Sequence, residues 1–516
     1  MMSKNEASRH QWGTDTQGAI LQGQVDVISV VEAPTAALTG TASRRLNALP
    51  DERLEKVEGW GRAVSGLSYV YRPTEAAGIL EAFEIARQTG RSVGLRGAGR
   101  SYGDASLNAE NLVLDLSRMN RILAWDPQAG VITVEPGVTV QQLWQYVIED
   151  GWWPAVVPGT MYATLGGCAA MNIHGKNNWR VGPIGDHITE FRAVLPGGEQ
   201  VTCSRVQRPE LFHAFIGGFG MLGCFTAITL QLKRIYSGLL SVEAIPTPDL
   251  AAMFAGFEER LDRADYLVGW LDGMAGGSAL GRGQLHRADY LAPDADPFPA
   301  QTLRVSCQQL PETFFGVLPR SSLWRLMQPL TNDPGIRLIN AARYHGRRLG
   351  GRKGYFQSHA AFAFLLDYVP DWKLAYGPGG LIQYQAFIPA PAAPDAFERI
   401  LRLAQRSGLP PYLAVFKRHR PDAFLISHAV EGYSLALDYR VTAENRPALA
   451  RLTAGLDRLV LEAGGRFYFA KDGTLSPASV AAFLGQDTLN RFCALKRRCD
   501  PENLLQTNLS RRLFDF

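Results

Sequence analysis

The sequence has few cysteines and no paired cysteine motif. Its six cysteines are scattered along 516 residues, at positions 168, 203, 224, 307, 493 and 499, and no two form a Cys-x-x-Cys pair. This spacing argues against a disulfide scaffold and a cysteine-ligated zinc site, so we predict no metal centre. A chain with so few thiols fits a reducing compartment best, and we predict a cytoplasmic protein.

An excess of one charge and a long apolar run are also missing. The chain carries 53 lysines and arginines against 49 acidic residues, a formal net charge of +4, which argues against nucleic-acid binding. No apolar run reaches the roughly 18 residues of a membrane-spanning helix, and residues 1–20 lack the pattern of a secretory signal. Any membrane contact is therefore expected to be peripheral, at the inner membrane.

Strand and helix patterns alternate along most of the chain. Residues 1–54 are mostly polar and small, and we predict a flexible extension with one candidate strand at 25–31. In the first half, helical spacing at 75–90 and 138–150 alternates with strand-like segments at 92–96, 111–115, 131–135 and 153–157. In the second half, we expect helices at 247–262, 394–407 and 445–463, strands at 266–272, 381–388 and 433–440, and an irregular stretch at 287–320. This mixture predicts an α+β fold.

Glycine is abundant and gathers in separate short segments. The first is Arg96-Gly97-Ala98-Gly99-Arg100-Ser101-Tyr102, which follows an apolar strand, and the others lie at 158–170 and 217–223. Glycine lets backbone N–H groups approach an anion closely. The first segment is not the usual dinucleotide fingerprint, because no clear helix pattern follows it, and alone it fits a tight turn equally well. Recurrence of such segments favours a large phosphate-bearing cofactor.

Several polar residues stand where they could contact a ligand. His174 lies in a polar stretch beside glycine, and Gln383 and Gln385 share one face of a predicted strand. Lys417 and Lys471 each follow apolar residues at a strand end, where burial could lower the pKa of the amine. Each also has a structural interpretation: a loop histidine that caps a turn, an exposed sheet face, and surface lysines that extend to solvent.

The densest basic cluster lies at 343–355. It combines Arg343, His345, Arg347, Arg348, Arg352 and Lys353 with Tyr344 and Tyr355. Three interpretations stay open for it: a solvated loop, attraction to an anionic membrane surface, and nucleic-acid binding.

Together these motifs resemble the vanillyl-alcohol oxidase or PCMH-type superfamily of FAD-binding proteins, and within it the decaprenylphosphoryl-ribose 2-oxidase family. The runs that carry the resemblance lie at 97–104, 173–177, 375–378, 383–385 and 464–472. It extends from about residue 59 to the C-terminus. The resemblance implies a two-domain fold with an inserted antiparallel-sheet substrate domain. The expected order is an extension at 1–54, an FAD domain at 55–235, a substrate domain at 236–465, and a segment at 466–516 that returns to the FAD domain.

The resemblance also implies a role for each matching residue. The residues expected to hold FAD are Arg96, Gly97, Ala98, Gly99, Arg100, Ser101, Tyr102, Pro158, Gly159, Thr160, Thr164, Gly166, Gly167, Asn172, His174, Gly175, Lys176, Gly223 and Tyr468. Those expected to face the substrate are Tyr102, Gln383, Gln385, Lys417 and Ser434. Lys471 and His174 are the candidates for handling the proton of the substrate hydroxyl. Many members attach FAD through a histidine where this chain has Arg100, so we expect FAD to be non-covalent.

The activity implied is oxidation of the 2-hydroxyl of a polyprenyl-phosphate-linked pentose. The keto sugar would pass to a separate NAD(P)H-dependent reductase, which would complete an epimerisation in cell-envelope glycan biosynthesis. Two alternatives remain: an FAD-dependent alditol or aldonolactone oxidase with a soluble substrate, and a flavin-binding protein without turnover. Lys417 and the basic cluster favour an anionic lipid substrate, whereas the apolar segment at 363–366 favours a different one.

Overall fold

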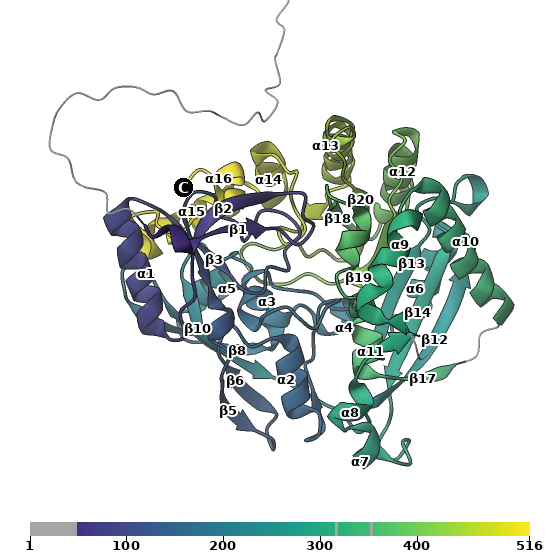
Figure 1. The fold of residues 1–516 in the computed structure, drawn as a ribbon. Helices are drawn as coiled ribbons and strands as arrows, with labels where there is room; N and C mark the ends of the chain where they lie inside the picture. The colour runs from purple at the N-terminus through teal and green to yellow at the C-terminus, as the bar shows by residue number, and fades with distance from the viewer. Residues whose placement is uncertain (1–48, 315–317, 351–353) are drawn as a thin grey trace, which may run out of the picture. The chain divides into compact units, whose positions relative to one another are not determined.

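The computed structural model describes residues 49–314, 318–350 and 354–516, and Leu46–Phe516 form one compact unit. The candidate strand at 25–31 and most of the predicted extension lie outside the described residues. The end of that extension forms the 3-10 helix η1 (Asp51–Arg53) and the start of strand β1 (Leu54–Glu58). Mixed helices and antiparallel sheets confirm the predicted α+β class (Figure 1).

The first sheet supports the first glycine-rich segment. Its strand order is β1-β2-β4-β3, with β2 (Ser65–Tyr71), β4 (Leu112–Asp115) and β3 (Val93–Arg96) running parallel. Helix α1 (Ala76–Thr89) joins β2 to β3 and buries Ile79 and Phe83. It ends at Gly90, whose φ of 64° fits the left-handed position that glycine adopts at helix ends. The predicted helix and both predicted strands are confirmed.

A second, antiparallel sheet follows in the order β5-β6-β10-β8-β9. Its strands are β5 (Ile122–Asp126), β6 (Val131–Val134), β10 (Cys224–Gln231), β8 (Ile188–Val194) and β9 (Gln200–Ser204). Helix α2 (Val140–Val147) begins at a capping box formed by Thr139 and Gln142. The strand predicted at 153–157 is largely wrong, because only β7 (Trp152–Trp153) forms there, paired with β11 (Lys233–Arg234). Pro154 lacks the N–H that a continuing ladder needs.

The largest sheet has eight strands, and every pair is antiparallel. Its order is β17 (Tyr355–Ser358), β12 (Leu239–Thr247), β14 (Gly283–Tyr290), β13 (Tyr266–Leu271), β19 (Leu413–His419), β20 (Gly432–Arg440), β18 (Leu381–Pro389) and β21 (Arg466–Phe467). Helices α6 (Leu250–Glu258), α12 (Ala393–Arg406) and α13 (Arg446–Glu462) contact it. Phe254 and Phe397 from these helices pack on Phe416 of β19. The helices and strands predicted in this half are confirmed, and the described part of 287–320 holds only short elements beyond the end of β14.

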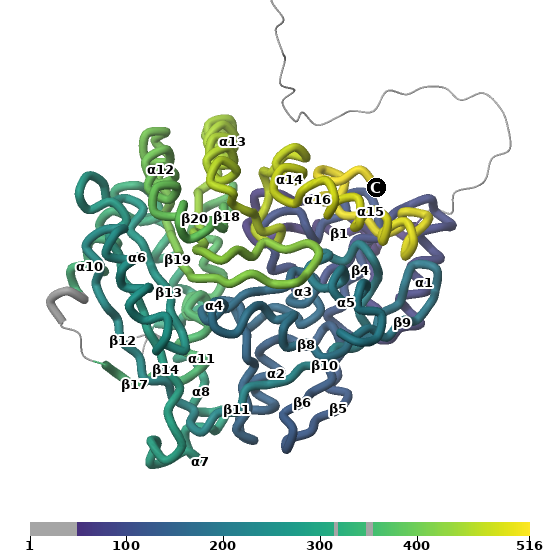
Figure 2. Tube along the Cα trace, turned by 180° about the vertical axis from the view of Figure 1, so that it is seen from behind, coloured from purple at the N-terminus to yellow at the C-terminus, as the bar shows by residue number. Residues whose placement is uncertain are grey.

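The C-terminal segment packs back onto the first sheet. Helices α14 (Pro477–Leu484), α15 (Gln486–Cys499) and α16 (Asn508–Leu513) lie toward the first sheet, at the end of the molecule away from α6 and α10 (Asp333–Gly350) (Figures 1 and 2). Leu505 forms a parallel bridge with Val93 of β3. This packing supports the expected return of 466–516 to the FAD domain, while the domain boundaries themselves stay predictions.

The first part of the basic cluster, residues 343–350, is helical. It falls in helix α10 (Asp333–Gly350), so the loop interpretation is wrong there. Residues 351–353 lie outside the described ranges. Within those ranges, no helix is long and apolar enough to cross a membrane.

A buried ion pair holds the C-terminal segment in place. Lys496 Nζ lies 2.5 Å from Asp500 Oδ2 and donates to the Leu505 carbonyl, while Asp500 accepts the N–H groups of Leu504 and Leu505. Asp500→Ala would leave Lys496 buried without its partner, so we expect the free energy of unfolding to fall by about 3–5 kcal/mol.

Denaturant unfolding monitored by tryptophan fluorescence measures this loss. The matched control is Asp487→Ala, an exposed acid on the same helix, which should cost no more than about 1 kcal/mol. Equal midpoints for Asp500→Ala and the control would contradict a role of the pair in stability.

Candidate active site

The glycine-rich segments and one face of the eight-stranded sheet line a single cavity of about 600 Å³. Every site residue predicted from the sequence, except Asn172 and Gly175, lies on its wall. Segments that are far apart in the sequence therefore meet at one place. In Figure 1, β3 and helix α3 (Leu165–Ala170) lie on the left, and strands β13 and β19 lie on the right.

The first glycine-rich segment needs glycine for steric reasons. A Cβ atom on Gly97 would lie 2.0 Å from Thr164 Oγ1, far inside van der Waals contact. Gly99 has a φ of +62°, in the region that favours glycine. Arg96 braces the turn from behind, donating to the Ser106 hydroxyl at 2.9 Å and to the Glu58 carbonyl at 3.0 Å. The segment thus presents bare backbone to the cavity.

Aromatic rings and a cation flank this backbone. The Arg100 guanidinium carbon lies 4.3 Å from the centroid of the Trp60 ring and 5.3 Å from that of Tyr162. The same guanidinium faces the cavity, and its Nε atom has no hydrogen-bond partner among the described residues. Such a site can hold a flat ring system or an anionic group.

The second glycine-rich segment is tied to the substrate side by a carboxylate. The Thr160 hydroxyl donates to Asp367 Oδ1 at 2.8 Å, and the Met161 N–H donates to Asp367 Oδ2 at 2.7 Å. Burial raises the pKa of Asp367 to about 6, opposed by these hydrogen bonds and by Arg100. Asp367 therefore fixes the loop that carries Gly159 and Thr160 against the 3-10 helix η7 (Leu365–Tyr368).

His174 lies at the centre of the polar part of the cavity. Its Nε2 atom is 3.2 Å from Gln385 Nε2, and its Nδ1 atom is 3.5 Å from Lys417 Nζ. Burial lowers the pKa of His174 well below its usual value, and the charges of Lys417 and nearby histidines lower it further. The imidazole is therefore neutral at physiological pH and suited to orienting a hydroxyl group.

Two further lysines share this space. Burial lowers the pKa of Lys417 to about 8. Burial and repulsion by Lys417 lower the pKa of Lys176 to about 7, and its amine donates to the Phe362 carbonyl. A cavity with so many partly charged amines attracts an anionic ligand.

Lys471 pairs electrostatically with a buried carboxylate. Its Nζ atom lies 3.8 Å from the centroid of the Tyr102 ring. Burial lowers the pKa of Lys471, an effect opposed by Asp438, and burial raises the pKa of Asp438. Asp438 Oδ1 accepts a 2.5 Å hydrogen bond from Gln383 Nε2, while Oδ2 has no hydrogen-bond partner among the described residues. The Asp438 carboxylate therefore favours the charged form of Lys471 against the effect of burial.

The sheet register explains why these groups converge. Successive side chains on a strand point to opposite faces. On β18, Gln383 and Gln385 pair with Asp438 and Ala436 of β20, and Lys417 of β19 pairs with Ser434. Each of these residues except Asp438 directly lines the cavity. The predicted shared face of Gln383 and Gln385 is thus confirmed by the register.

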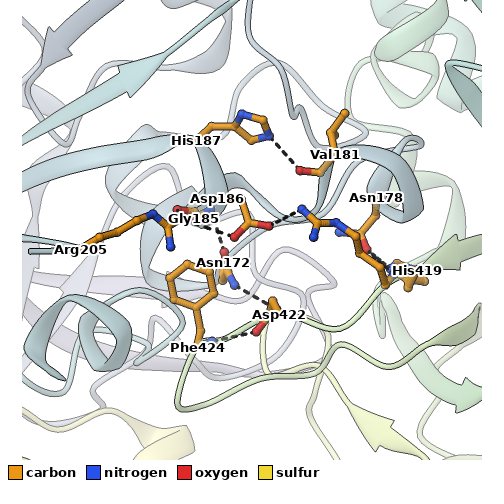
Figure 3. A network of polar contacts seen from close by, with 11 residues as sticks. Asn172, Asn178, Val181, Gly185, Asp186, His187, Arg205, His419, Asp422 and Phe424 are labelled. Atoms are coloured by element: carbon orange, nitrogen blue, oxygen red, sulfur yellow. Dashed lines mark hydrogen bonds and ion pairs between the residues drawn. The ribbon is translucent and has the colours of Figure 1, made fainter. Parts of the chain in front are cut away.

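Asn172 has a structural role instead of a place on the cavity wall. Its φ is 43°, its side chain is fully buried, and its Oδ1 accepts the N–H of Gly185 at 3.0 Å. Its Nδ2 lies 3.4 Å from Asp422, within the network of Figure 3. Gly175 is also away from the wall, where a Cβ would lie 2.5 Å from Asn177 Oδ1. The sequence pattern did not separate residues that shape the loop from residues that reach the ligand.

Several residues of the cavity wall and its support were not predicted from the sequence. Trp60, Asp367, Trp270 and His286 line the cavity, and Asp438 supports it. A signal existed for Asp438, because a carboxylate on an otherwise apolar strand is unusual. The others come from segments without a distinctive local pattern.

The described residues fit FAD. Several cavity residues are glycines at which a Cβ would clash with neighbouring atoms, and others, such as Ala98 and Ala170, are small. They leave room for a large, flat cofactor, and the Arg100 Nε atom without a hydrogen-bond partner suits an anionic one. The backbone around Gly97 would hold the phosphates, and the loop at Gly159 and Thr160 would line the ring system.

Gly97→Ala tests this assignment. The added Cβ would meet Thr164 Oγ1, so we expect the affinity for FAD to fall about tenfold to a hundredfold. Flavin titration of the apoprotein, followed by fluorescence quenching, measures the change. Gly197→Ala is the matched control, since nothing lies within 4 Å of its Cβ. Wild-type FAD affinity in Gly97→Ala would remove this loop from the cofactor site.

Comparisons with known proteins agree with the geometry. Residues 67–204 match the family described as "FAD binding domain". The chain is 28% identical over 476 residues to decaprenylphosphoryl-β-D-ribose oxidase of Mycolicibacterium smegmatis, covering 89% of this chain and 97% of the relative. It is 22% identical over 485 residues to a putative D-arabinono-1,4-lactone oxidase of Neurospora crassa, covering 86% of this chain and 83% of that relative.

A further match covers a shorter part of the chain. It is 27% identical to cytokinin dehydrogenase 2 of Oryza sativa over 210 residues, which are 39% of this chain and 37% of the relative. The chain is therefore an FAD-dependent oxidoreductase related to decaprenylphosphoryl-ribose oxidase and to sugar lactone oxidases.

Proposed function

We propose that this protein oxidises the 2-hydroxyl of a polyprenyl-phosphate-linked pentose to a 2-keto sugar. The observation that carries the proposal is the meeting of Lys471, His174 and Lys417 on the wall of one cavity with the glycine-rich segments. Similarity along nearly the whole length of decaprenylphosphoryl-β-D-ribose oxidase supports it. Bound FAD would accept the hydride that leaves the carbon bearing the hydroxyl.

Lys471 is proposed to take the hydroxyl proton. Its lowered pKa makes the neutral amine available, and the charge of the Asp438 carboxylate would stabilise the ammonium that forms when Lys471 takes the proton. His174 is a poorer base, because burial and neighbouring cations oppose its protonation. We assign it the role of orienting the hydroxyl together with Gln385, which lies 3.2 Å away.

Gln383, Gln385 and Ser434 are proposed to bind the remaining sugar hydroxyls. Tyr102 would contact the sugar beside the Lys471 amine, which lies 3.8 Å from the centroid of the Tyr102 ring. Lys417 and Lys176 supply positive potential, which favours a substrate that carries a phosphate. FAD is proposed to be bound non-covalently, since the resemblance implies that Arg100 stands where many members carry the attaching histidine.

The remaining parts of the proposal concern partners. A separate nicotinamide-dependent reductase would return a hydride to the keto sugar and complete the epimerisation. A lipid-linked substrate also implies peripheral contact with a membrane surface, which the basic residues of α10 favour.

A soluble alditol or aldonolactone is the second candidate substrate. It is favoured by the similarity to a lactone oxidase and by the apolar wall residues Ala363, Leu365 and Leu366. These residues would accommodate a smaller ligand without a phosphate.

The substrate class is tested by an anaerobic visible spectrum of the purified holoenzyme. We expect one equivalent of farnesylphosphoryl-ribose to bleach the flavin bands completely, because the two electrons of the alcohol reduce FAD. A yellow protein that bleaches with xylitol or a lactone instead would establish the second candidate and contradict the first.

The proposed base is tested by Lys471→Met. We expect the rate of flavin reduction to fall about a hundredfold to ten-thousandfold, while Lys56→Met, an exposed lysine paired with Glu58, keeps the wild-type rate. Since the base must be the neutral amine, the wild-type rate should rise with pH, with a midpoint below the 10.5 of an ordinary lysine.

Asp438→Asn provides the matching pH test. The Asp438 carboxylate raises the pKa of Lys471, so its removal should move the rising limb of the profile to lower pH. Stopped-flow reduction across the pH range measures both variants. A wild-type rate in Lys471→Met, or an unmoved profile in Asp438→Asn, would assign the proton to another group.

A further inference from the structure

An arginine stands on the cavity wall away from the glycine-rich segments. Arg343 belongs to α10, and its guanidinium carbon lies 4.2 Å from the centroid of the Trp270 ring on β13. Both residues line the cavity. Stacking on the indole holds the planar guanidinium in place and leaves its N–H donors free to face a ligand.

The guanidinium has no protein counter-ion among the described residues. The nearby carboxylate of Asp272 is occupied by Arg282 at 2.9 Å and by Asn340 Nδ2 at 2.9 Å. Partial burial lowers the pKa of Arg343 to about 10, which leaves it charged at neutral pH. Arg343 as a whole is exposed to solvent, but its guanidinium is stacked on Trp270 and faces a cavity without a carboxylate partner, an arrangement that can bind an external anion.

The backbone around Arg343 is firmly anchored. Its carbonyl accepts a 2.8 Å hydrogen bond from Gln284 Nε2 of β14. Asn340, one turn earlier on α10, is buried against Asp272, and Tyr344 is buried beside it. The side chain therefore extends from a fixed position, which is what a preorganised ligand contact requires.

We propose that Arg343, stacked on Trp270, binds the phosphate of the substrate and selects phosphorylated sugars over neutral ones. This assignment of the anion rests on the proposed function. The chemical class of ligand is a phosphodiester, which an arginine fork binds through two parallel hydrogen bonds.

The sheet register places this site next to the proposed reaction centre. Trp270 of β13 pairs with Val415 of β19, two residues before Lys417 on the same face. Adjacent strands lie about 4.8 Å apart. Arg343 therefore packs on β13, the strand next to β19, which carries Lys417. In the proposed substrate the phosphate is attached to C1, the carbon beside the oxidised C2. An anion held by Arg343 thus suits a hydroxyl held near Lys417 and His174.

The site is also separate from the segments assigned to the phosphates of FAD. Those segments follow β3 and precede α3, whereas Arg343 and Trp270 belong to α10 and β13 at the eight-stranded sheet (Figures 1 and 2). The cavity therefore offers one anion site on each side.

Binding of farnesyl phosphate to the holoenzyme tests the proposal without turnover, because this probe has no sugar to oxidise. Calorimetry should show binding about tenfold to a hundredfold weaker in Arg343→Gln than in the wild type. Arg343→Lys keeps the charge but loses the fork and should lie between them. Arg337→Gln, an exposed arginine on the same helix, should bind as the wild type does. Equal affinity of Arg343→Gln and the wild type would overturn the proposal.

Two further probes serve as controls: farnesol, which carries no charge, and ribonate, which carries a carboxylate instead of a phosphate. Farnesol should bind wild type and Arg343→Gln equally, and a parallel loss of farnesol binding would show that the variant merely distorts the cavity, which also overturns the proposal. If Arg343→Gln weakens binding of ribonate but not of farnesyl phosphate, the ligand is a carboxylate and the phosphodiester assignment is wrong.

Kinetics separate this inference from the proposed function. With farnesylphosphoryl-ribose, Arg343→Gln should raise KM and leave kcat within about twofold, as loss of uniform binding requires. Arg343-dependent binding of farnesyl phosphate in an enzyme that farnesylphosphoryl-ribose does not reduce would uphold the anion site and reject the pentose. If Arg343→Gln is fully reduced by farnesylphosphoryl-ribose with an unchanged KM, the pentose substrate is upheld and the anion site at Arg343 is rejected.

Discussion

The cost of placing several cationic side chains in one poorly solvated cavity constrains the rest of the site. Lys176, Lys417 and Lys471 line the same wall, and burial lowers the pKa of each. Their mutual repulsion lowers it further at Lys176 and Lys471. His174, which lies among them, is consequently held neutral. The buried Asp438 carboxyl group opposes this effect at Lys471, whereas Asp367 interacts with Arg100. The site can thus supply both a neutral amine as base and a positive potential for an anion.

The fold makes this arrangement possible by separating support from chemistry. One face of the eight-stranded sheet is packed by aromatic side chains around Phe416, and the other bears Lys417 and Ser434. Because side chains alternate along a strand, the packed face fixes the register of the polar face. The glycine-rich segments oppose that polar face with backbone instead of side chains. A cofactor and a substrate can therefore approach one another across a cavity whose walls are set by the core.

The sequence predicted the regular elements and the cavity segments because these have local causes. Glycine spacing, a capped helix end at Gly90 and the alternation around Gln383 and Gln385 are properties of short stretches. The strand at 153–157 failed at Pro154, where one residue outweighs the apolar pattern. The basic cluster was not placed on a helix, since its charges obscured the continuation of α10.

The partners of the site residues were less accessible from the sequence. Asp438 meets Gln383 only through the register of β18 with β20, and Asp367 meets Thr160 only after distant segments dock. Arg343 meets Trp270 in the same way, across separate elements. The resemblance placed Asn172 among the residues expected to hold FAD, yet its left-handed backbone and its hydrogen bond to Gly185 give it a structural role. Local patterns identify which residues carry chemistry, whereas packing decides which of them face each other.

The lowered pKa values also connect ligand charge to protonation. Burial lowers the pKa of Lys417 to about 8 and that of Lys176 to about 7. An anion bound nearby favours the charged amines and so raises both values. Between these values and the 10.5 of an ordinary lysine, binding of the anion is therefore accompanied by proton uptake, and its affinity decreases as the pH rises. Below about pH 7 both amines are already charged, and this linkage disappears. A neutral sugar gains nothing from these protons, so the buried lysines themselves discriminate between a phosphorylated substrate and an uncharged one.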